Sequence, residues 1–208
     1  ILLDPVHKLN VLSRAMKGVH NSIKNPFLGE VPSLSSKKPT HFGYYQSFNS
    51  VSRVEDVILD ELWSVLENRE RSQLERDLDG VEIIHIRQGD TLTPNNLKKV
   101  GVLSSDYYTQ IPSKSVRKRI VLTDDADGAR KTLSSLHIDE IFGPSELNVH
   151  QTLGVMARST TLYAANSTLS WWGGFLAQRR GSRVFLPNPF FREFSPAPEQ
   201  SFAYPTFN

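Results

Sequence analysis

Three short segments of the sequence carry polar side chains that could bind or activate a substrate. The first, HIRQGD, begins at His85 and follows the apolar run VEII. In a strand the side chains of His85 and Arg87 would share one face, because side-chain directions alternate along a strand, and Gly89 would then allow a sharp turn. Arginine is well shaped to bind phosphate through paired hydrogen bonds. An ion pair between Arg87 and Asp90 beside a buried histidine explains the segment equally well.

The second segment, VLTDDADG, begins at Val121 and places several carboxylates after an apolar run. Asp124 and Asp125 could hold sugar hydroxyls or the edge of a base. Asp125 and Asp127 also match the D-x-D pattern of metal-dependent nucleotide-sugar transferases. A third interpretation is that these acids cap a helix and fill its first turn, where they complement the helix dipole.

The third segment, ANSTLSWWGG, has amide and hydroxyl donors directly ahead of a predicted helix, at Asn166, Ser167, Thr168 and Ser170. The N-terminus of a helix binds anions readily, because its first N–H groups have no partner within the helix. The alternatives are an ordinary N-cap beside buried tryptophans and an N-glycosylation acceptor of the N-x-[ST] type. We disfavour glycosylation, because a sequon between a buried strand and a helix would be poorly accessible.

The composition narrows the kinds of site that the chain could hold. The 208 residues include no cysteine, which excludes disulfides, thiolate zinc sites and cysteine nucleophiles. The formal net charge of +2 argues against a chain-wide polybasic character. Aromatic residues do not alternate with a basic stripe, so we expect no nucleic-acid partner. No apolar run reaches the roughly 18 residues that a membrane-spanning helix requires, and none is predicted.

Short β-branched runs alternate with helical patterns in the second part of the chain. The predicted strands are Val81–Ile86, Arg119–Leu122, Ile138–Ile141, Thr161–Ala164 and Arg183–Leu186. The predicted helices between the last four strands are Ala126–Leu136, Glu146–Ser159 and Ser170–Arg180, the last of which precedes the fifth strand. Such alternation predicts an α/β fold with a Rossmann-like, mostly parallel sheet. Ligands bind such sheets at the carboxyl ends of the strands, where all three polar segments fall.

The region that precedes the first strand has a different character. Ser52 and Glu55 have the spacing of a capping box, and apolar residues then recur at three- and four-residue steps through Leu66. This pattern predicts an amphipathic helix, and we expect its charged tail, ENRERSQLERDLDG, to be solvated. We therefore divide the chain into residues 1–79, with a loop and this linking helix, and residues 80–208, the ligand-binding domain.

In combination, these segments resemble the α1,2-fucosyltransferases, glycosyltransferase family 11. HIRQGD resembles the family's H-[IV]-R-R-G-D, VLTDDAD resembles its [FV]-[ST]-[DN]-D strand end, and AANSTLSWWGGFLAQ is close to its A-N-S-[ST]-F-S-W-W-[GA]-x-[WF]-L signature. GYYQS and GVLSSDYYTQ resemble two further elements of the family, and the second of these opens a helix at its Asp-Tyr-Tyr group. The order and spacing agree over about residues 41–190.

Two departures from the family pattern accompany this resemblance. Gln88 stands where the family has a second arginine, so we expect one phosphate-facing charge to be lost and the choice of donor to be affected. The family's G-G-L-G-N-Q-[ML] segment does not occur in the 208 residues. Because that segment belongs to the first of two Rossmann-like halves, we expect the chain to hold the donor half of a GT-B-type glycosyltransferase and the end of the other half.

The resemblance implies an inverting, metal-independent transfer of L-fucose from GDP-β-L-fucose to a sugar hydroxyl, commonly the 2-OH of a galactose. The partners would be a GDP-sugar donor and a glycan acceptor, with no cofactor. A transferase of another nucleotide sugar and an inactive carbohydrate- or nucleotide-binding relative are the alternatives. We expect a cytoplasmic protein, with peripheral membrane association as an option, or a Golgi protein if an upstream region carries an anchor.

The resemblance also suggests roles for the polar side chains. Arg87 would bind the diphosphate, and Asp90 would help to orient it and is the candidate base for the acceptor hydroxyl. His85 would likewise shape the site around Arg87. Asp124 and Asp125 would hold the guanine or the fucose hydroxyls. The other donors would face the diphosphate or the ribose, and these are Asn166, Ser167, Thr168 and Ser170.

Overall fold

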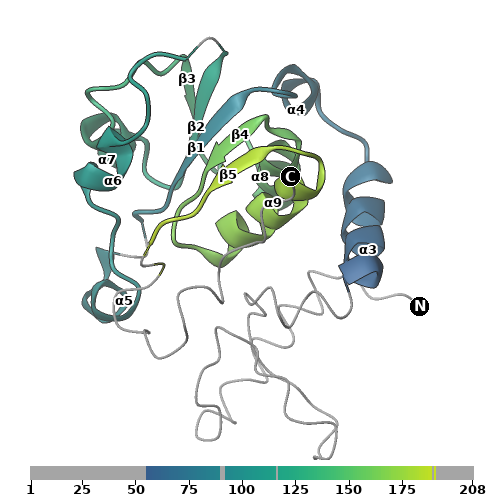
Figure 1. Cartoon of the computed structure of the whole chain (residues 1–208), viewed down its shortest axis with the longest axis horizontal. Helices are drawn as coiled ribbons and strands as arrows, with labels where there is room; N and C mark the ends of the chain where they lie inside the picture. The colour runs from purple at the N-terminus through teal and green to yellow at the C-terminus, as the bar shows by residue number, and fades with distance from the viewer. Residues whose placement is uncertain (1–54, 90–91, 116, 189, 191–208) are drawn as a thin grey trace, which may run out of the picture.

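The computed structural model describes residues 55–89, 92–115, 117–188 and 190 (Figure 1). These residues form a five-stranded sheet in which every pairing is parallel. The strands are β1 (Glu82–Ile86), β2 (Arg119–Thr123), β3 (Glu140–Phe142), β4 (Thr161–Tyr163) and β5 (Arg183–Phe185). Each overlaps one predicted strand, so the predicted α/β, Rossmann-like architecture is confirmed.

The order of the strands determines where a ligand could bind. They are arranged as β3-β2-β1-β4-β5. The chain therefore adds β2 and β3 on one side of β1 and then crosses back to add β4 and β5 on the other side. In open parallel sheets such a reversal opens a crevice at the carboxyl ends of the strands, and ligands bind there. In this sheet the reversal lies between β1 and β4.

Helices cover both faces of the sheet. They are α3 (Glu55–Glu67), α4 (Gln73–Asp77), α5 (Pro94–Lys99), α6 (Ser105–Thr109), α7 (Ala126–Thr132), α8 (Val149–Arg158) and α9 (Thr168–Arg179). Because side chains alternate along a strand, Ile83 joins a buried cluster with Met156 of α8. Its neighbour Ile84 joins a different cluster, with Tyr108 of α6 and Ala129 of α7. Among the described residues, no helix is long and apolar enough to span a membrane.

Helices α8 and α9, which cover the face of the sheet that carries Ile83, approach each other closely. A β-carbon at Gly173 of α9 would lie 2.9 Å from the β-carbon of Met156 on α8. Glycine at position 173 therefore allows a short distance between α8 and α9, and a larger residue there would push the two helices apart. The close packing seats α9 on the sheet, and the side chains of Trp171 and Phe175 are completely buried there.

The charged segment after α3 is not a solvated helix end, so that prediction is wrong. The amphipathic helix itself is present over Glu55–Glu67, although its predicted cap at Ser52 lies outside the described residues. A second helix, α4, begins after Ser72, whose side chain accepts from the Glu75 N–H in a capping box. The Glu75 side chain is buried, with a relative exposure of 1%. The S-x-x-E spacing within the charged tail therefore starts a new helix instead of extending α3.

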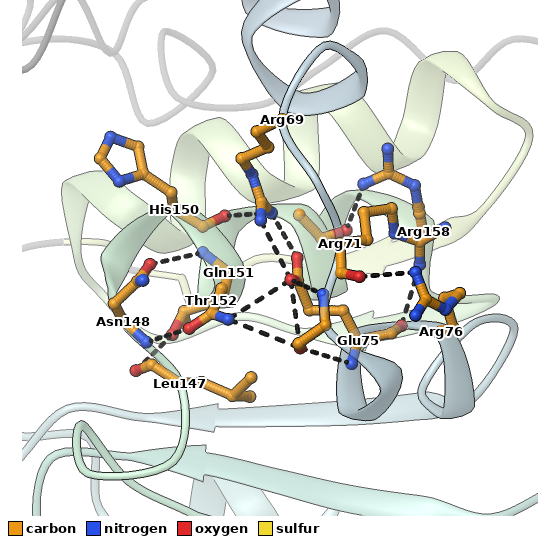
Figure 2. A network of polar contacts seen from close by, with 12 residues as sticks. Arg69, Arg71, Glu75, Arg76, Leu147, Asn148, His150, Gln151, Thr152 and Arg158 are labelled. Carbon is orange, nitrogen blue, oxygen red and sulfur yellow. Dashed lines mark hydrogen bonds and ion pairs between the residues drawn. The ribbon is translucent and has the colours of Figure 1, made fainter.

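A network of polar contacts fixes α4 to α8 (Figure 2). Arg69 donates from both terminal nitrogens to the Glu75 carboxylate, and Gln151 of α8 donates to it as well. Burial by itself would raise the pKa of Glu75, but the hydrogen bonds and charge of Arg69, with the Ser72 N–H, hold that pKa at about 2. The network thus joins the linking segment to the sheet, while the proposed division near residue 80 remains a prediction.

Candidate functional site

Polar side chains from β1, β2 and the start of α9 lie at the carboxyl edge of the sheet. We call this group the strand-end site, and it consists of His85, Arg87, Asp124, Asp125 and residues 166–170. Strand β1 pairs with β2 on one side and with β4 on the other. The three polar segments that the sequence analysis identified therefore meet at the reversal of strand order, as the parallel sheet predicts.

The His85 ring is buried against the start of α9. Alternation along β1 directs it to the same face as Ile83, the face that α8 and α9 cover. Its Nδ1 lies 2.6 Å from the hydroxyl oxygen of Ser170, which also accepts from the N–H of Ala165 at 2.8 Å. Burial, with the positive charge of Arg87 nearby, lowers the pKa of His85 to about 4. His85 is therefore a neutral link between β1 and α9 at neutral pH.

The Asp124 carboxylate holds the end of β1. Its Oδ2 lies 3.1 Å from Nε of Arg87, and its Oδ1 accepts from the backbone N–H of Gln88 at 2.8 Å. Arg87 keeps 35% of its side-chain surface exposed. Arg87 thus forms an ion pair with Asp124, which directly follows β2, while the predicted pair with Asp90 is not tested. Asp90 lies outside the described residues, and its predicted roles stay predictions.

Gly89 allows the Asp124 carboxylate to come this close. A β-carbon at residue 89 would lie 2.8 Å from Oδ2 of Asp124. Gly89 is not among the glycines with positive φ, which are Gly80, Gly101 and Gly181. The glycine therefore allows a close approach between β1 and Asp124 without a left-handed backbone, and it lies in a turn, as the sequence predicted.

The Gln88 side chain faces α7 instead of the Arg87 side of the strand. It is 9% exposed, and its Nε2 donates to Oγ1 of Thr132 at 3.0 Å. Its Oε1 packs beside Gly128, where a β-carbon would lie 2.6 Å away. Alternation therefore turns Gln88 toward α7, while the expected loss of a phosphate-facing charge and its effect on donor choice stay predictions.

The acids after β2 lie at the start of α7. Asp125 is the N-cap of this helix, and its side chain accepts from the N–H of Gly128 at 3.0 Å. Asp127 pairs with Arg130 at 3.0 Å and keeps 87% of its side chain exposed. The capping interpretation is thus confirmed for Asp125. Within the ranges that the structure describes, no group of three or more histidine, aspartate and glutamate side chains is placed to hold a metal ion.

The amide group of Asn166 points toward the turn that follows α5. Its Nδ2 donates to the carbonyls of Val100 and Gly101, each at 3.1 Å. The residue is 4% exposed, and its Oδ1 is buried without a hydrogen-bond partner in the described structure. Because a buried polar atom without a partner is costly, this oxygen is an acceptor that a ligand hydroxyl or N–H could satisfy.

Helix α9 begins at the strand-end site. Ser167 is its N-cap, and the Ser167 hydroxyl accepts from the N–H of Ser170 at 3.1 Å. Thr168 is the first residue of the helix, and no acidic residue occurs in the first turn. The N-terminus of a helix carries about half of a positive charge. The N-cap interpretation is confirmed for Ser167, and the helix terminus adds positive potential to the edge that holds Arg87.

Comparison with known proteins places this geometry in a family. The model of the family described as "Glycosyl transferase family 11" matches residues 10–204. The chain belongs to glycosyl transferase family 11. The O-antigen biosynthesis glycosyltransferase WbnK of Escherichia coli is 30% identical to it over 115 residues. That alignment covers 52% of this chain and 38% of the relative, so the chain spans less than half of the relative's length.

Family membership confirms the predicted resemblance and, with it, a glycosyltransferase class. The five-stranded sheet is consistent with one Rossmann-like half of a GT-B-type family 11 enzyme. A transferase of this class takes a nucleotide sugar as donor and a glycan as acceptor. Arg87 and the α9 terminus share this edge with the carboxylates of Asp124 and Asp125.

Sequence reasoning missed one side chain that shapes the family 11 site. The hydroxyl of Tyr107 donates to the carbonyls of Ala164 and Phe185, at 3.0 and 3.2 Å. These contacts tie α6 to the carboxyl ends of β4 and β5, and burial raises the pKa of the Tyr107 hydroxyl above its usual value. The only signal in the sequence was the Asp-Tyr-Tyr group, which does open α6.

Proposed function

We propose that this family 11 protein transfers L-fucose from GDP-β-L-fucose to a sugar hydroxyl, with inversion, forming an α1,2 linkage to galactose. The observation that carries the proposal is the ion pair between Arg87 and Asp124 at the end of β1, the strand whose His85 contacts Ser170 in the first turn of α9. It places an oriented cation at the reversal point of a parallel sheet. The choice of fucose and of GDP rests on the motifs that resemble the α1,2-fucosyltransferases.

The chemistry requires an electropositive site for the leaving group. As the acceptor hydroxyl attacks the anomeric carbon, the bond to the diphosphate breaks and negative charge grows on the departing oxygen. In the proposal Arg87 stabilises that charge through hydrogen bonds from its guanidinium. The first N–H groups of α9 assist. His85 adds no charge because its lowered pKa keeps it neutral, and it positions α9 through Ser170.

The contacts in the strand-end site refine the roles of three predicted binding residues. Both oxygens of Asp124 are engaged with the end of β1, so Asp124 acts as a positioning residue for Arg87. Asp125 fixes the start of α7, where it can border the nucleoside. Asn166 uses its N–H donors on the turn after α5, and its unpartnered Oδ1 would accept from a ribose or fucose hydroxyl.

Inversion also requires a base for the acceptor proton, and Asp90 is our candidate for that role. No metal ion or cofactor takes part in the proposed reaction, since Arg87 and the α9 terminus supply the positive charge. Measurement of transfer with and without EDTA tests this point. Activity that disappears with EDTA and returns with a divalent cation would instead support the D-x-D interpretation of Asp125 and Asp127.

Replacement of Arg87 by alanine in the full-length protein tests the central assignment. We expect the kcat/KM for GDP-fucose to fall by roughly two to three orders of magnitude, because one transition-state charge contact is lost. Arg130→Ala is the matched control, since Arg130 is an exposed cation that pairs with Asp127 away from Arg87. Unchanged turnover in Arg87→Ala would refute the assignment.

A panel of donors distinguishes the proposed function from its alternatives. Release of free nucleotide is measured with GDP-fucose, other GDP-sugars and UDP-sugars. Preference for a donor other than GDP-fucose would favour a different transferase of the same family. Calorimetry addresses a binding protein without activity: such a protein would bind glycan or nucleotide but would release none of the nucleotides from the panel.

A further inference from the structure

A hollow of about 400 Å³ lies at the amino ends of β4 and β5, at the edge of the sheet opposite to the strand-end site. Four arginines share in its lining, namely Arg117, Arg158, Arg180 and Arg183. The remaining lining residues are Ser159, Thr160, Thr161, Gly181 and Ser182, so no acidic residue lines it. We call this feature the arginine hollow.

The four guanidinium groups differ from several other arginines of the described chain in their lack of an ion pair. In the part of the chain that the structure describes, none of the four forms an ion pair. Other buried or half-buried arginines nearby do form one: Arg119 pairs with Glu82 at 2.6 Å, and Arg69 pairs with Glu75. The arginine hollow therefore gathers four arginines, none of which is in ion-pair contact with a described acid.

Helix dipoles account for only part of this charge. Arg158 ends α8 and Arg180 is the C-cap of α9, so both lie where cations complement a helix C-terminus. Each C-terminus carries about half of a negative charge. The two termini together offset about one of the four positive charges. The carboxylates of Asp79 and Glu67, which lie outside the lining, also act on Arg158, and the lining itself keeps a net positive charge.

Aromatic packing holds two of the cations in place. The guanidinium of Arg158 lies 5.4 Å from the ring centre of Trp63, and that of Arg180 lies 5.0 Å from it. Both therefore contact the same indole of α3. Burial, with the positive charges of Arg71 and Arg180, lowers the pKa of Arg158, although the carboxylates of Asp79 and Glu67 act in the opposite direction. An anion bound in the hollow would offset the repulsion between Arg158 and Arg180.

Three of the hydroxyl groups in the lining donate to backbone carbonyls and therefore not to a ligand. The Ser159 hydroxyl donates to the carbonyl of Met156, and the Ser182 hydroxyl donates to the carbonyl of Ser159. Thr160 donates in the same way to the backbone beside Gly80. Since these protons are engaged with carbonyls, a ligand would be held mainly by the guanidinium groups. Guanidinium groups favour phosphate, which they bind through paired hydrogen bonds.

We propose that the arginine hollow binds a phosphate group of a ligand other than the sugar donor. Several guanidinium groups around one hollow suit a multiply charged phosphate better than a single carboxylate. The phosphate could belong to a soluble diphosphate or to the headgroup of an anionic lipid, since both present the same chemistry. The hollow is compact, whereas single-stranded nucleic acid requires an extended basic groove with stacking aromatics. The proposal does not depend on the identity of the transferred sugar.

The test measures two probes against the full-length protein. Inorganic pyrophosphate is titrated by calorimetry, and vesicles of phosphatidylcholine with and without phosphatidylglycerol are used in sedimentation. The variant Arg117→Gln/Arg183→Gln removes two exposed cations from the hollow, and Arg183→Gln alone is a milder variant if the double variant does not fold. Lys131→Gln, an exposed cation on α7, is the matched control. Arg87→Ala reports on the strand-end site.

We expect the hollow variants to weaken binding by roughly tenfold for each guanidinium removed, in the wild type and in the Arg87→Ala background alike, and Lys131→Gln to leave binding unchanged. This pattern with pyrophosphate assigns a soluble phosphate, and the same pattern with phosphatidylglycerol vesicles only assigns a lipid headgroup. Failure of both probes to bind overturns the proposal. Binding that Arg87→Ala abolishes, and that the hollow variants leave intact, overturns it too, because the phosphate would then occupy the strand-end site.

Discussion

The Ser170 hydroxyl joins the His85 ring to the backbone N–H of Ala165, with distances of 2.6 and 2.8 Å. The hydroxyl accepts from Ala165 and shares a second hydrogen bond with Nδ1 of a neutral His85, whose donor is set by the tautomer of the ring. Through this one hydroxyl, the end of β1 is fixed to the turn that starts α9, and the strand-end site depends on both elements.

Replacement of Ser170 by alanine should destabilise this connection. Two buried groups, the imidazole and the Ala165 N–H, would lose their partner. We expect the free energy of unfolding to fall by about 1–3 kcal/mol, which is the usual cost of an unsatisfied buried polar group. Urea unfolding followed by circular dichroism measures the change. A midpoint equal to that of the wild type would show that the hydroxyl is not needed.

Protonation of His85 should destabilise the fold as the pH falls. Its pKa is lowered from 6.5 to about 4, so the unfolded chain binds a proton in this range and the folded chain does not. The stabilisation is complete above pH 6.5 and is lost progressively down to about pH 4. The shift corresponds to about 3 kcal/mol. Unfolding free energies across this range measure it, and His85→Gln should remove that part of the slope.

Substitution of Gly89 by alanine should displace the Asp124 carboxylate and thereby change the orientation of the Arg87 guanidinium. The new β-carbon would lie 2.8 Å from Oδ2 of Asp124, so the carboxylate must move away from the guanidinium. We expect the KM for the donor to rise by roughly tenfold or more, because the cation loses its orientation. Donor kinetics measure this. Gly143→Ala is the control, since its β-carbon would meet no atom closer than 3.5 Å.

The hydrogen bonds of Glu75 with Arg69 and Gln151 should affect the free energy of unfolding at acidic pH, and they should not affect catalysis. Glu75→Gln leaves the Arg69 charge without its buried partner, and we expect a loss of about 3–5 kcal/mol in the free energy of unfolding. In the wild type the pKa of Glu75 is about 2 instead of 4.5. Its stabilisation of about 3 kcal/mol is therefore complete above pH 4.5 and declines toward pH 2. Glu70→Gln, at an exposed position, provides the comparison, and equal effects of the two substitutions would contradict the assignment.

Much of the fold could be predicted because its signals are local. Each of the five strands is a short β-branched run, and the α7 and α9 starts carry a polar N-cap after an apolar strand. The misread element was the charged tail after α3. Its composition suggested solvent exposure, yet Glu75 is buried because Arg69 and a residue of α8 satisfy its oxygens. Burial of a charge depends on partners that no local pattern specifies.

The sequence by itself determined that three polar segments stand at strand ends and that parallel strands bring those ends to one edge. Tertiary structure decided what each side chain there contacts. Asp124 faces the end of β1, a residue 36 positions away, and Asn166 reaches the turn at Gly101, 65 positions away. Strand alternation combined with the position of α7 turned Gln88 away from the Arg87 face. The arginine hollow likewise gathers residues from separate elements, because the amino ends of the strands and the ends of two helices meet there. Local propensity sets which residues end each element, whereas packing alone sets which of those ends become neighbours.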